Sequence, residues 1–366
     1  MKLKTETVWK SLKLHLAAYF WLMGSQSIRF AFTSKNCILL KVNHTGIAPY
    51  LPGLLAGFDR DSLCTGIGDR KTLLSLYLLK DRKLPRTTIC LFPSEQSRRW
   101  VIDNHHAPGA DHLTRFDYFH AVRKAHQNKL PAHEAILPFV MHPSQYGKLR
   151  DTTDSEKRRI KVFFSGNTHP KSYNQPQLRS LFGVMTRSEI HRAVLDDLAP
   201  FLNTRLNGDV SRPVWWLSWQ WQQGEPAPDN RIGNDEWMDF LFNSDFFVAC
   251  PGVNMPLSHN LIEAMYAGCI PILPYASWLY PALKDGENCL TFSGRESLIQ
   301  CIQKALSMPD GELKAMRQAV QQYYSDHLHP DGVRKIIMDP AVKTSYFAMN
   351  MVSTSLFAKE QNNRAN

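Results

Sequence analysis

The chain has 366 residues, of which 43% are hydrophobic and 21% are charged. This is the composition of an ordinary globular protein, and it excludes a disordered or fibrous chain. The length predicts two domains, each large enough to bury a core of its own. The formal net charge of +10 predicts affinity for anions such as nucleotide phosphates, nucleic acid or acidic lipid headgroups. A solvated basic surface without a dedicated partner is an equally good interpretation.

The cysteines favour a reducing environment. Seven of them are scattered along the chain, and none forms a Cys-x-x-Cys pair. An odd number without this spacing predicts neither a disulfide framework nor a zinc site, and buried free thiols are its usual explanation. We therefore expect a cytoplasmic protein.

The N-terminus carries the strongest candidate for a membrane contact. Lysines at positions 2, 4, 10 and 13 precede an apolar run over 14–23. This run is too short to span a bilayer, and no signal-peptide cleavage site is obvious after it. We expect a helix that docks on the first domain. The alternative is a basic amphipathic helix that lies on the inner membrane surface.

Short apolar runs alternate with helical patterns in the first part of the chain. Strands are expected at 37–42, 88–92, 100–102 and 136–140, and helices at 72–80 and 116–127. The run at 136–140 closes the first domain, which we place at 1–145.

The same alternation begins again after a charged stretch at 151–159. Strands are expected at 161–165, 214–221, 246–250, 269–273 and 288–292, and helices at 188–201, 235–243, 261–267 and 296–307. A second domain is therefore expected at 146–340, followed by a weakly patterned tail at 341–366. Two such blocks predict an α/β fold of two Rossmann-like domains, each with a parallel sheet.

The segment 245–273 is the most informative part of the chain. Pro251-Gly252 interrupts a short strand, and a helix then runs to Gly268. In parallel α/β sheets, ligands bind beyond the carboxyl ends of the strands, where helix N-termini present unpaired N–H groups. The segment therefore predicts a bound nucleotide. The candidate N-caps of the helix are Ser258, His259 and Asn260.

Glu263 has two interpretations. With Asn260 as N-cap, Glu263 is the third residue of the helix, where the two side chains would together stabilise the helix end. In the functional interpretation, Glu263 accepts hydrogen bonds from ribose hydroxyls, while the N–H groups around Leu261 hold a phosphate. Gly252 would then let the backbone approach the ligand closely.

These residues carry a resemblance to a known family. Pro251-Gly252, Glu263-Ala264 and the run GCIPIL at 268–273 resemble the donor-binding half of GT-B glycosyltransferases, and the exostosin-like enzymes most closely. The runs at 136–140 and 161–167 stand where that family switches domains. The resemblance implies two Rossmann-like domains that face an interdomain cleft. The second would hold a nucleotide sugar and the first a glycan or lipid-linked saccharide acceptor, as in polysaccharide biosynthesis.

Two departures from the family pattern bear on the chemistry. Asn260 stands where exostosin-like proteins usually carry a basic residue, so His259, Lys161, Arg179 or the helix end alone must meet the phosphate charge. Met255 stands where retaining GT-B enzymes carry the first of two glutamates, which favours inversion. No DxD motif follows a strand, so we expect neither a metal nor a bound cofactor beside the nucleotide sugar.

We expect the donor to contact two loops of the second domain. Gly166 and Asn167 follow the first strand of that domain, although Asn167 is equally well explained as a plain turn residue. The full expected donor set is Gly166, Asn167, Arg179, Pro251, Gly252, Ser258, His259, Asn260, Leu261 and Glu263.

Inversion needs a base that takes the proton of the acceptor hydroxyl. In this fold the base usually projects from a loop after a strand of the N-terminal domain. His44, which follows the strand at 37–42, is one candidate. Asp103, with the neighbouring His105 and His106, is the other. A histidine in such a loop can equally be a solvated or structural residue.

Three alternatives remain open at this stage. The tryptophans at 215, 216, 219 and 221 could stack on sugar rings, but their alternation favours packing of one face in the core. The same fold could catalyse epimerisation or hydrolysis of a nucleotide sugar. The chain could also be a basic carbohydrate- or nucleic-acid-binding protein without catalysis, although its basic residues are dispersed rather than clustered beside aromatics, which argues against nucleic acid.

Overall fold

The computed structural model describes residues 28–34, 38–58, 63–66, 70–77, 87–93, 97–145, 158–219 and 230–365. The expected N-terminal helix over 14–23 and Trp221 lie outside these residues. The chain forms two compact units, one built from Met1–Gly147 and His329–Met349, the other from Lys148–Leu328 and Asn350–Asn366. In the described ranges, every helix is too short or too polar to cross a bilayer.

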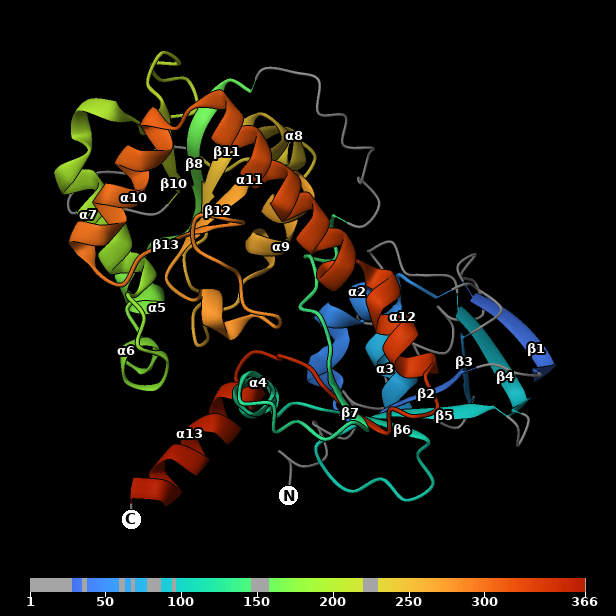
Figure 1. Ribbon diagram of the computed structural model, residues 1–366. Coiled ribbons are helices and arrows are strands. Elements are labelled where there is room, and N and C mark those ends of the chain that lie inside the picture. The colour runs from blue at the N-terminus through green and yellow to red at the C-terminus, as the bar shows by residue number, and fades with distance from the viewer. Residues whose placement is uncertain are drawn as a thin grey trace, which may run out of the picture. The chain divides into compact units, whose positions relative to one another are not determined.

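The first unit is built on a parallel sheet with the strand order β1-β4-β3-β2-β5-β6-β14-β7 (Figure 1). All seven strand pairings in it are parallel. Its strands are β1 (Ile28–Ser34), β2 (Ile38–Val42), β3 (Leu63–Gly66), β4 (Thr87–Pro93), β5 (Arg98–Ile102), β6 (His112–Arg115), β7 (Glu134–Ile136) and β14 (Thr344–Tyr346).

The strand order of this sheet reverses direction between β2 and β5. Strands β3 and β4 follow β2 on one side, whereas β5 and β6 continue on the other. Val42 pairs with Ile102, so the two strands end at the same level. In doubly wound sheets, such a reversal opens a crevice beyond the carboxyl ends of the two central strands. The loops that carry His44 and Asp103 begin at this crevice.

Helices and short turns connect the strands of the first unit. They are η1 (Thr45–Tyr50), α2 (Leu51–Leu55), α3 (Arg70–Tyr77), α4 (Tyr118–His126) and α12 (Pro330–Met338). A buried hydrogen-bond network ties β5, β6 and β14 together. The Trp100 indole N–H donates to Thr114 Oγ1 at 2.8 Å, and Thr114 Oγ1 and His112 Nε2 each lie 2.8 Å from Ser345 Oγ.

The C-terminal part of the chain departs from the expected domain boundaries. We expected the second domain to run to residue 340 and a tail to follow, but α12 and β14 belong to the first unit. The three-residue strand β14 pairs in parallel with both β6 and β7, which fills a place inside the sheet. Helix α13 (Val352–Ala365) then belongs to the second unit.

The second unit is built on a parallel sheet with the order β13-β12-β11-β8-β10-β9. Here the order reverses between β8 and β11, the two central strands. The strands are β8 (Ile160–Gly166), β9 (Leu202–Asn203), β10 (Val214–Ser218), β11 (Ser244–Val248), β12 (Ile270–Leu273) and β13 (Leu290–Thr291). The expected two-domain α/β class with parallel sheets is confirmed.

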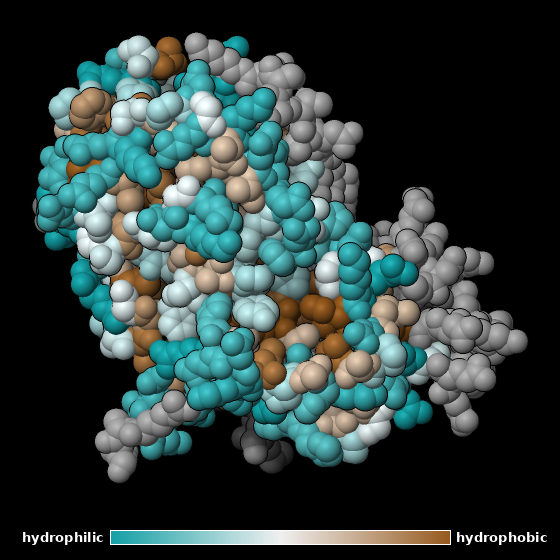
Figure 2. Space-filling model, viewed as in Figure 1, coloured by the Kyte–Doolittle hydropathy of each residue, from teal (hydrophilic) through white to brown (hydrophobic). Residues whose placement is uncertain are grey.

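Helices cover both faces of this second sheet (Figure 1). They are α5 (Pro170–Tyr173), α6 (Gln177–Phe182), α7 (Arg187–Asp197), η2 (Ala199–Phe201), α8 (Trp237–Phe242), α9 (His259–Tyr266), η3 (Ala276–Trp278), α10 (Arg295–Ser307), α11 (Asp310–Tyr323) and η4 (Tyr324–Leu328). Figure 2 shows mainly hydrophilic residues, with smaller hydrophobic groups among them, over the outer sides of α10 and α11. The apolar residues of α10 and α11 are buried on their inner sides.

Aromatic side chains of β8 and β10 alternate between the two faces of this sheet. Phe163 packs against Phe240 of α8, with ring centroids 5.7 Å apart. Phe164 stacks on Trp216, whose indole N–H donates to His191 of α7 at 2.7 Å. Trp215 packs against Phe240. The core interpretation of the tryptophans is thus confirmed for Trp216, whereas Trp215 is half-buried.

One expectation from the cysteines is wrong. Cys64 in β3 forms a disulfide bond, whereas the scattered spacing predicted none. Cys250, Cys269, Cys289 and Cys301 are free thiols, as expected. A disulfide at Cys64 removes the ground on which we expected a reducing compartment.

Candidate functional site

Arg187 lies in the crevice of the second sheet, where it joins the two loops that follow β8 and β11. Its Nε donates to the Pro251 carbonyl at 3.1 Å, and its Nη1 donates to the Asn167 carbonyl at 3.2 Å. The guanidinium also stacks on Tyr173, 4.2 Å from the ring centroid. Only 7% of the residue is exposed. Arg187 therefore holds together the carboxyl edge of the sheet at its point of reversal.

The position of Arg187 follows from the start of α7. Thr186 is the N-cap and forms a capping box with Glu189, because each side chain binds the backbone N–H of the other residue. Arg187 is thus the first helical residue, and its side chain turns toward the sheet edge. Within the described residues it forms no ion pair with a carboxylate. A buried cation without a counter-charge is costly, so this crevice favours an anionic ligand.

Helix α9 presents its N-terminus to the same edge. Its N-cap is Ser258, whose backbone is extended and whose side chain makes no capping hydrogen bond. The capping pair of Asn260 and Glu263 is therefore wrong, because these are the second and fifth residues of α9. The first N–H groups of an α-helix precede its regular ladder; here the N-cap side chain does not bind them, and the Leu261 N–H donates to the Ser258 carbonyl at 3.3 Å. They can bind an anion.

Two buried hydroxyls flank this helix end. Ser258 Oγ and Tyr275 Oη lie close to each other, yet neither completes a hydrogen bond of ordinary geometry with a described residue. Burial raises the pKa of Tyr275, and the nearby Arg187 lowers it slightly. Burial likewise raises the pKa of the Cys250 thiol to about 12 against the influence of Arg187. The groups around Arg187 are thus neutral donors and acceptors.

Glu263 points toward α8. It is 2% exposed, and its carboxylate accepts a hydrogen bond of 2.6 Å from the indole N–H of Trp237. Trp237 in turn packs against Phe163 and Phe247 of the sheet. This contact gives Glu263 a structural role. Its contact with a ribose stays a prediction.

The fold of the loop after β11 explains why glycine is required at position 252. A Cβ atom at this position would lie 2.9 Å from the Leu257 carbonyl oxygen and 3.0 Å from that of Met255. The loop folds back on its own backbone, and this close approach requires glycine. Asn254 anchors the loop, because its Oδ1 accepts from Gln177 at 2.8 Å.

Gly166 ends β8 beside Arg187, and Asn167 follows it. A Cβ at Gly166 would lie 3.4 Å from Arg187 Nη1. The Asn167 side chain accepts from the His169 N–H at 2.9 Å, which is the turn that we considered as the alternative. Its carbonyl, however, binds Arg187. Thr168 continues the edge, with its hydroxyl 2.7 Å from that of Ser218 at the end of β10.

The residues expected to meet the phosphate charge lie in different places. Arg179, in α6, pairs with Glu189 at 2.6 Å on an exposed surface. Lys161 is the second residue of β8 and pairs with Asp245 at 3.2 Å, at the amino edge of the sheet. At about 3.3 Å per residue, Lys161 lies about 16 Å from Gly166, so its expected role is wrong. His259 is the first residue of α9 and is half-buried.

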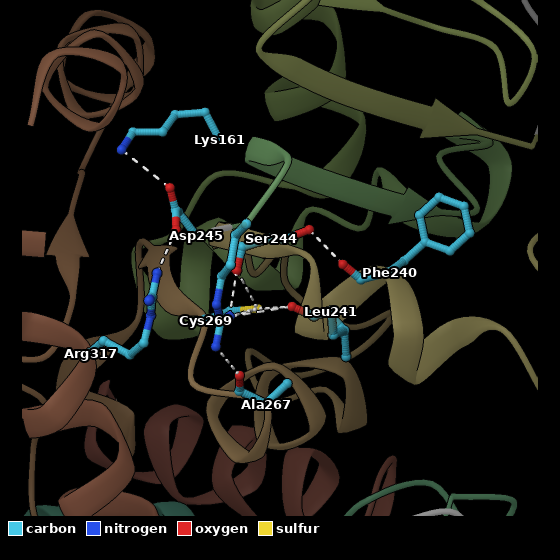
Figure 3. Close-up of polar contacts among 9 residues, drawn as sticks. Lys161, Phe240, Leu241, Ser244, Asp245, Ala267, Cys269 and Arg317 are labelled. Atoms are coloured by element: carbon cyan, nitrogen blue, oxygen red, sulfur yellow. Dashed lines mark hydrogen bonds and ion pairs between the residues drawn. The ribbon is translucent and has the colours of Figure 1, made fainter. Parts of the chain in front are cut away.

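Figure 3 shows this amino edge. The Arg317 guanidinium and the Lys161 ammonium both reach the Asp245 carboxylate. Nearby, Arg158 donates to the carbonyls of Ser244 and Ala267 at 2.6 and 2.7 Å. Ala267 is the C-cap of α9, so Arg158 satisfies the end of the helix that points away from the carboxyl edge.

At the carboxyl edge of the first sheet, a different pair of residues joins the two loops where the strand order reverses. Asn43 follows β2 and donates from Nδ2 to Asp103 Oδ2 at 2.8 Å. The His105 N–H donates to the other oxygen, Asp103 Oδ1, at 3.3 Å. Burial acts to raise the pKa of Asp103, but these hydrogen bonds hold it below its ordinary value. Asp103 is therefore an ionised carboxylate at neutral pH.

His44 lies at the same edge. Its ring packs edge-on against Phe116, with centroids 5.6 Å apart, and covers Gly46, where a Cβ would lie 3.0 Å from His44 Cε1. Its Nδ1 is buried without a hydrogen-bond partner in the described structure. The two candidate bases, His44 and Asp103, therefore come from adjacent strands to one edge. Among described side chains, no three His, Cys, Asp or Glu residues form a metal-binding group.

No family model and no curated protein matches the chain. Solved structures of low sequence identity are similar to it. Anabaena HepE in complex with UDP-glucose has a TM-score of 0.39 and 12% identity, over 82% of this chain and 98% of its own. The pneumococcal O-GlcNAc transferase GtfA, in complex with UDP and GlcNAc, has a TM-score of 0.32 and 12% identity, over 66% and 51%. The N-terminal domain of Candida albicans trehalose-6-phosphate phosphatase has a TM-score of 0.40 and 11% identity, over 84% and 96%.

Proposed function

We propose that the protein is a glycosyltransferase of the GT-B type, which transfers a sugar from a nucleotide-sugar donor to a glycan or lipid-linked saccharide. The donor diphosphate would bind at the carboxyl edge of the second unit. The observation that carries this proposal is Arg187, a buried cation at the reversal of the sheet whose hydrogen-bond partners are carbonyls rather than carboxylates.

The neighbouring groups fit a diphosphate. The N–H groups of the first turn of α9 and the positive end of its dipole would bind phosphate oxygens. The Ser258 and Tyr275 hydroxyls, which lack good partners in the described structure, would donate to the same oxygens. Arg187 would supply the positive charge that Asn260 does not. A diphosphate would thereby satisfy the buried donors of this edge together.

The reaction needs the leaving diphosphate to be stabilised as its charge grows. When an acceptor oxygen attacks the anomeric carbon, the bond from this carbon to the diphosphate breaks, and its electrons leave with the phosphate. Arg187 and the α9 N-terminus would stabilise this charge. The acceptor proton would go to a base of the first unit, and Asp103 and His44 both remain candidates. The exostosin-like subclass and inversion belong to the same proposal, which needs no resident cofactor.

A thermal-shift screen against UDP-, GDP-, ADP- and CMP-linked sugars tests donor binding. A ligand that binds only the native state stabilises it by about 2.7 kcal/mol at one hundred times its dissociation constant. We expect one nucleotide class to raise the melting temperature. If none does at millimolar concentration, the proposal fails.

Turnover then separates transfer from the related reactions. A transferase releases nucleoside diphosphate much faster when an acceptor glycan is present. Equally fast release without acceptor would indicate a hydrolase, and a changed sugar on an intact nucleotide would indicate an epimerase. Either result would replace glycosyl transfer as the function.

A further inference from the structure

A tryptophan and an arginine form a flat platform at the carboxyl edge of the second sheet. Trp219 directly follows β10, and its backbone N–H approaches the Gly166 carbonyl at 3.4 Å. The Arg231 guanidinium lies over the Trp219 indole, 5.0 Å from the ring centroid. Trp219 is half-buried and Arg231 is exposed, so the pair lies at the surface.

Asn230 fixes the platform in place. This residue is 2% exposed, and its Nδ2 donates to the carbonyls of Ser218 and Thr204 at 2.9 and 2.7 Å. Its Oδ1 accepts from the Leu206 N–H at 3.3 Å. Because Ser218 precedes Trp219 and Asn230 precedes Arg231, this one buried amide aligns both members of the pair.

The charge of Arg231 is not neutralised by the part of the chain that the structure describes, since it forms no ion pair there. Its stacking partner is aromatic. An arginine that stacks on an indole keeps the N–H groups in the plane of its guanidinium available for hydrogen bonding. Such a pair offers a π face together with donors. A planar ligand that carries carbonyl or ring-nitrogen acceptors would match both.

The platform and Arg187 lie on either side of one short segment. Gly166 contacts Trp219 through its carbonyl, and the carbonyl of the next residue, Asn167, contacts Arg187. Neighbouring strands are about 4.8 Å apart, so the edge from β10 across β8 to β11 spans about 10 Å. A nucleoside diphosphate could thus extend from the α9 N-terminus to β10.

We propose that Trp219 and Arg231 bind the base of the nucleotide, whose diphosphate lies at Arg187. The base would stack against the aromatic platform, and Arg231 would donate to an acceptor on its edge. This inference rests on the proposed function, because it assumes a nucleotide at this edge. It adds the orientation of that nucleotide and the residues that select its base.

Calorimetric titration of the full chain with nucleoside diphosphates and with inorganic pyrophosphate tests the platform. Base stacking on an aromatic side chain contributes about 10- to 100-fold in affinity. We expect Trp219→Leu to weaken binding of the preferred nucleoside diphosphate by about this factor and to leave pyrophosphate binding unchanged. Arg231→Gln, at an exposed position that cannot endanger the core, should weaken the nucleotide by about 5- to 10-fold, again without affecting pyrophosphate.

Two further variants complete the design. Trp219→Phe should retain most of the nucleotide affinity, because it keeps an aromatic face. Arg212→Gln, an exposed arginine that pairs with Asp209 just before β10, should change neither ligand. Equal loss of nucleotide and pyrophosphate in Trp219→Leu, or no loss in both Trp219→Leu and Arg231→Gln, would overturn the inference without contradicting the proposed diphosphate site of the wild type. A wild-type chain that binds no nucleotide would overturn both proposals.

Discussion

The strand order reverses in both sheets, but the residues that join the loops at the two reversals carry opposite charges. In the first unit, an amide and a carboxylate, Asn43 and Asp103, join the loops at the reversal. In the second unit, the cation of Arg187 joins two carbonyls there. The fold supplies a crevice in both cases. In our proposal, the bridging residue decides whether the crevice suits a hydroxyl that must lose a proton or a phosphate that carries charge.

Asp103→Asn should give the largest effect if the first crevice provides the base. General base catalysis contributes about 10²- to 10⁴-fold, so kcat should fall by this factor while donor affinity is unchanged. Asp117→Asn is the matched control, because Asp117 also follows a strand of the first sheet but pairs with Arg115 at 3.1 Å. If Asp103→Asn is as active as the wild type and His44→Ala is not, the base is His44.

Acid should weaken the first unit through His112. Burial lowers the pKa of this histidine to about 4, with smaller contributions from Arg98 and Lys343. Unfolded histidine titrates near 6.5, so the stabilisation is complete above pH 6.5 and is lost as pH falls toward 4. His112 alone should lower the free energy of unfolding of the first unit by about 2 kcal/mol from pH 7.5 to pH 5. Urea unfolding at the two pH values measures it.

The variant His112→Gln tests whether this acid-induced loss of stability arises in the first unit. His191 in the second unit also has a pKa lowered to about 4 by burial, so the wild type alone cannot separate the two. Because His112 lies 2.8 Å from Ser345 Oγ of β14, the protection factors for hydrogen exchange at 344–346, which are corrected for the intrinsic rate at each pH, should fall with acid in the wild type. In His112→Gln this acid dependence should disappear. Unchanged acid dependence would place the sensitive group elsewhere.

Substitution of Glu263 comes last, and it tests whether this residue belongs to the donor site of the second unit. Glu263→Ala leaves the Trp237 indole N–H unpaired, which should cost about 1–3 kcal/mol of stability. Glu263→Gln keeps an acceptor for Trp237, so its melting temperature should stay close to that of the wild type. If Glu263 also binds the ribose, both variants should lower donor affinity by about 10-fold. Unchanged affinity in both would leave Glu263 a purely structural residue.

The sequence predicted most strands of the second sheet and part of the first, because these strands are apolar runs bounded by turns. The expected strand at 37–42 is β2 (Ile38–Val42), and the expected strand at 161–165 lies within β8. Strands β1, β3 and β6 of the first sheet were not predicted. Strands β9 and β14 were missed as well, because they have two and three residues and too little pattern to detect. Their pairing depends on neighbours that are distant in sequence.

The site was predicted less completely than the fold. The helix expected at 188–201 begins at Arg187, one residue earlier, and the capping box of Thr186 and Glu189 could have revealed this start. No local pattern says that Arg187 turns into the crevice, since this depends on the loops after β8 and β11. For the same reason Lys161, which looked available, proved to pair with Asp245 at the other edge.

Donor binding by two arginine variants tests the central claim most directly. Arg187 and Arg158 both donate to backbone carbonyls, but at the carboxyl and amino edges of the same sheet. Hydrogen bonds to a charged group contribute about 1.5–3 kcal/mol, so Arg187→Gln should weaken the donor diphosphate by about 10- to 100-fold. Arg158→Gln, a comparable structural change, should leave it unaltered. Equal affinities in the two variants would contradict a diphosphate site at Arg187.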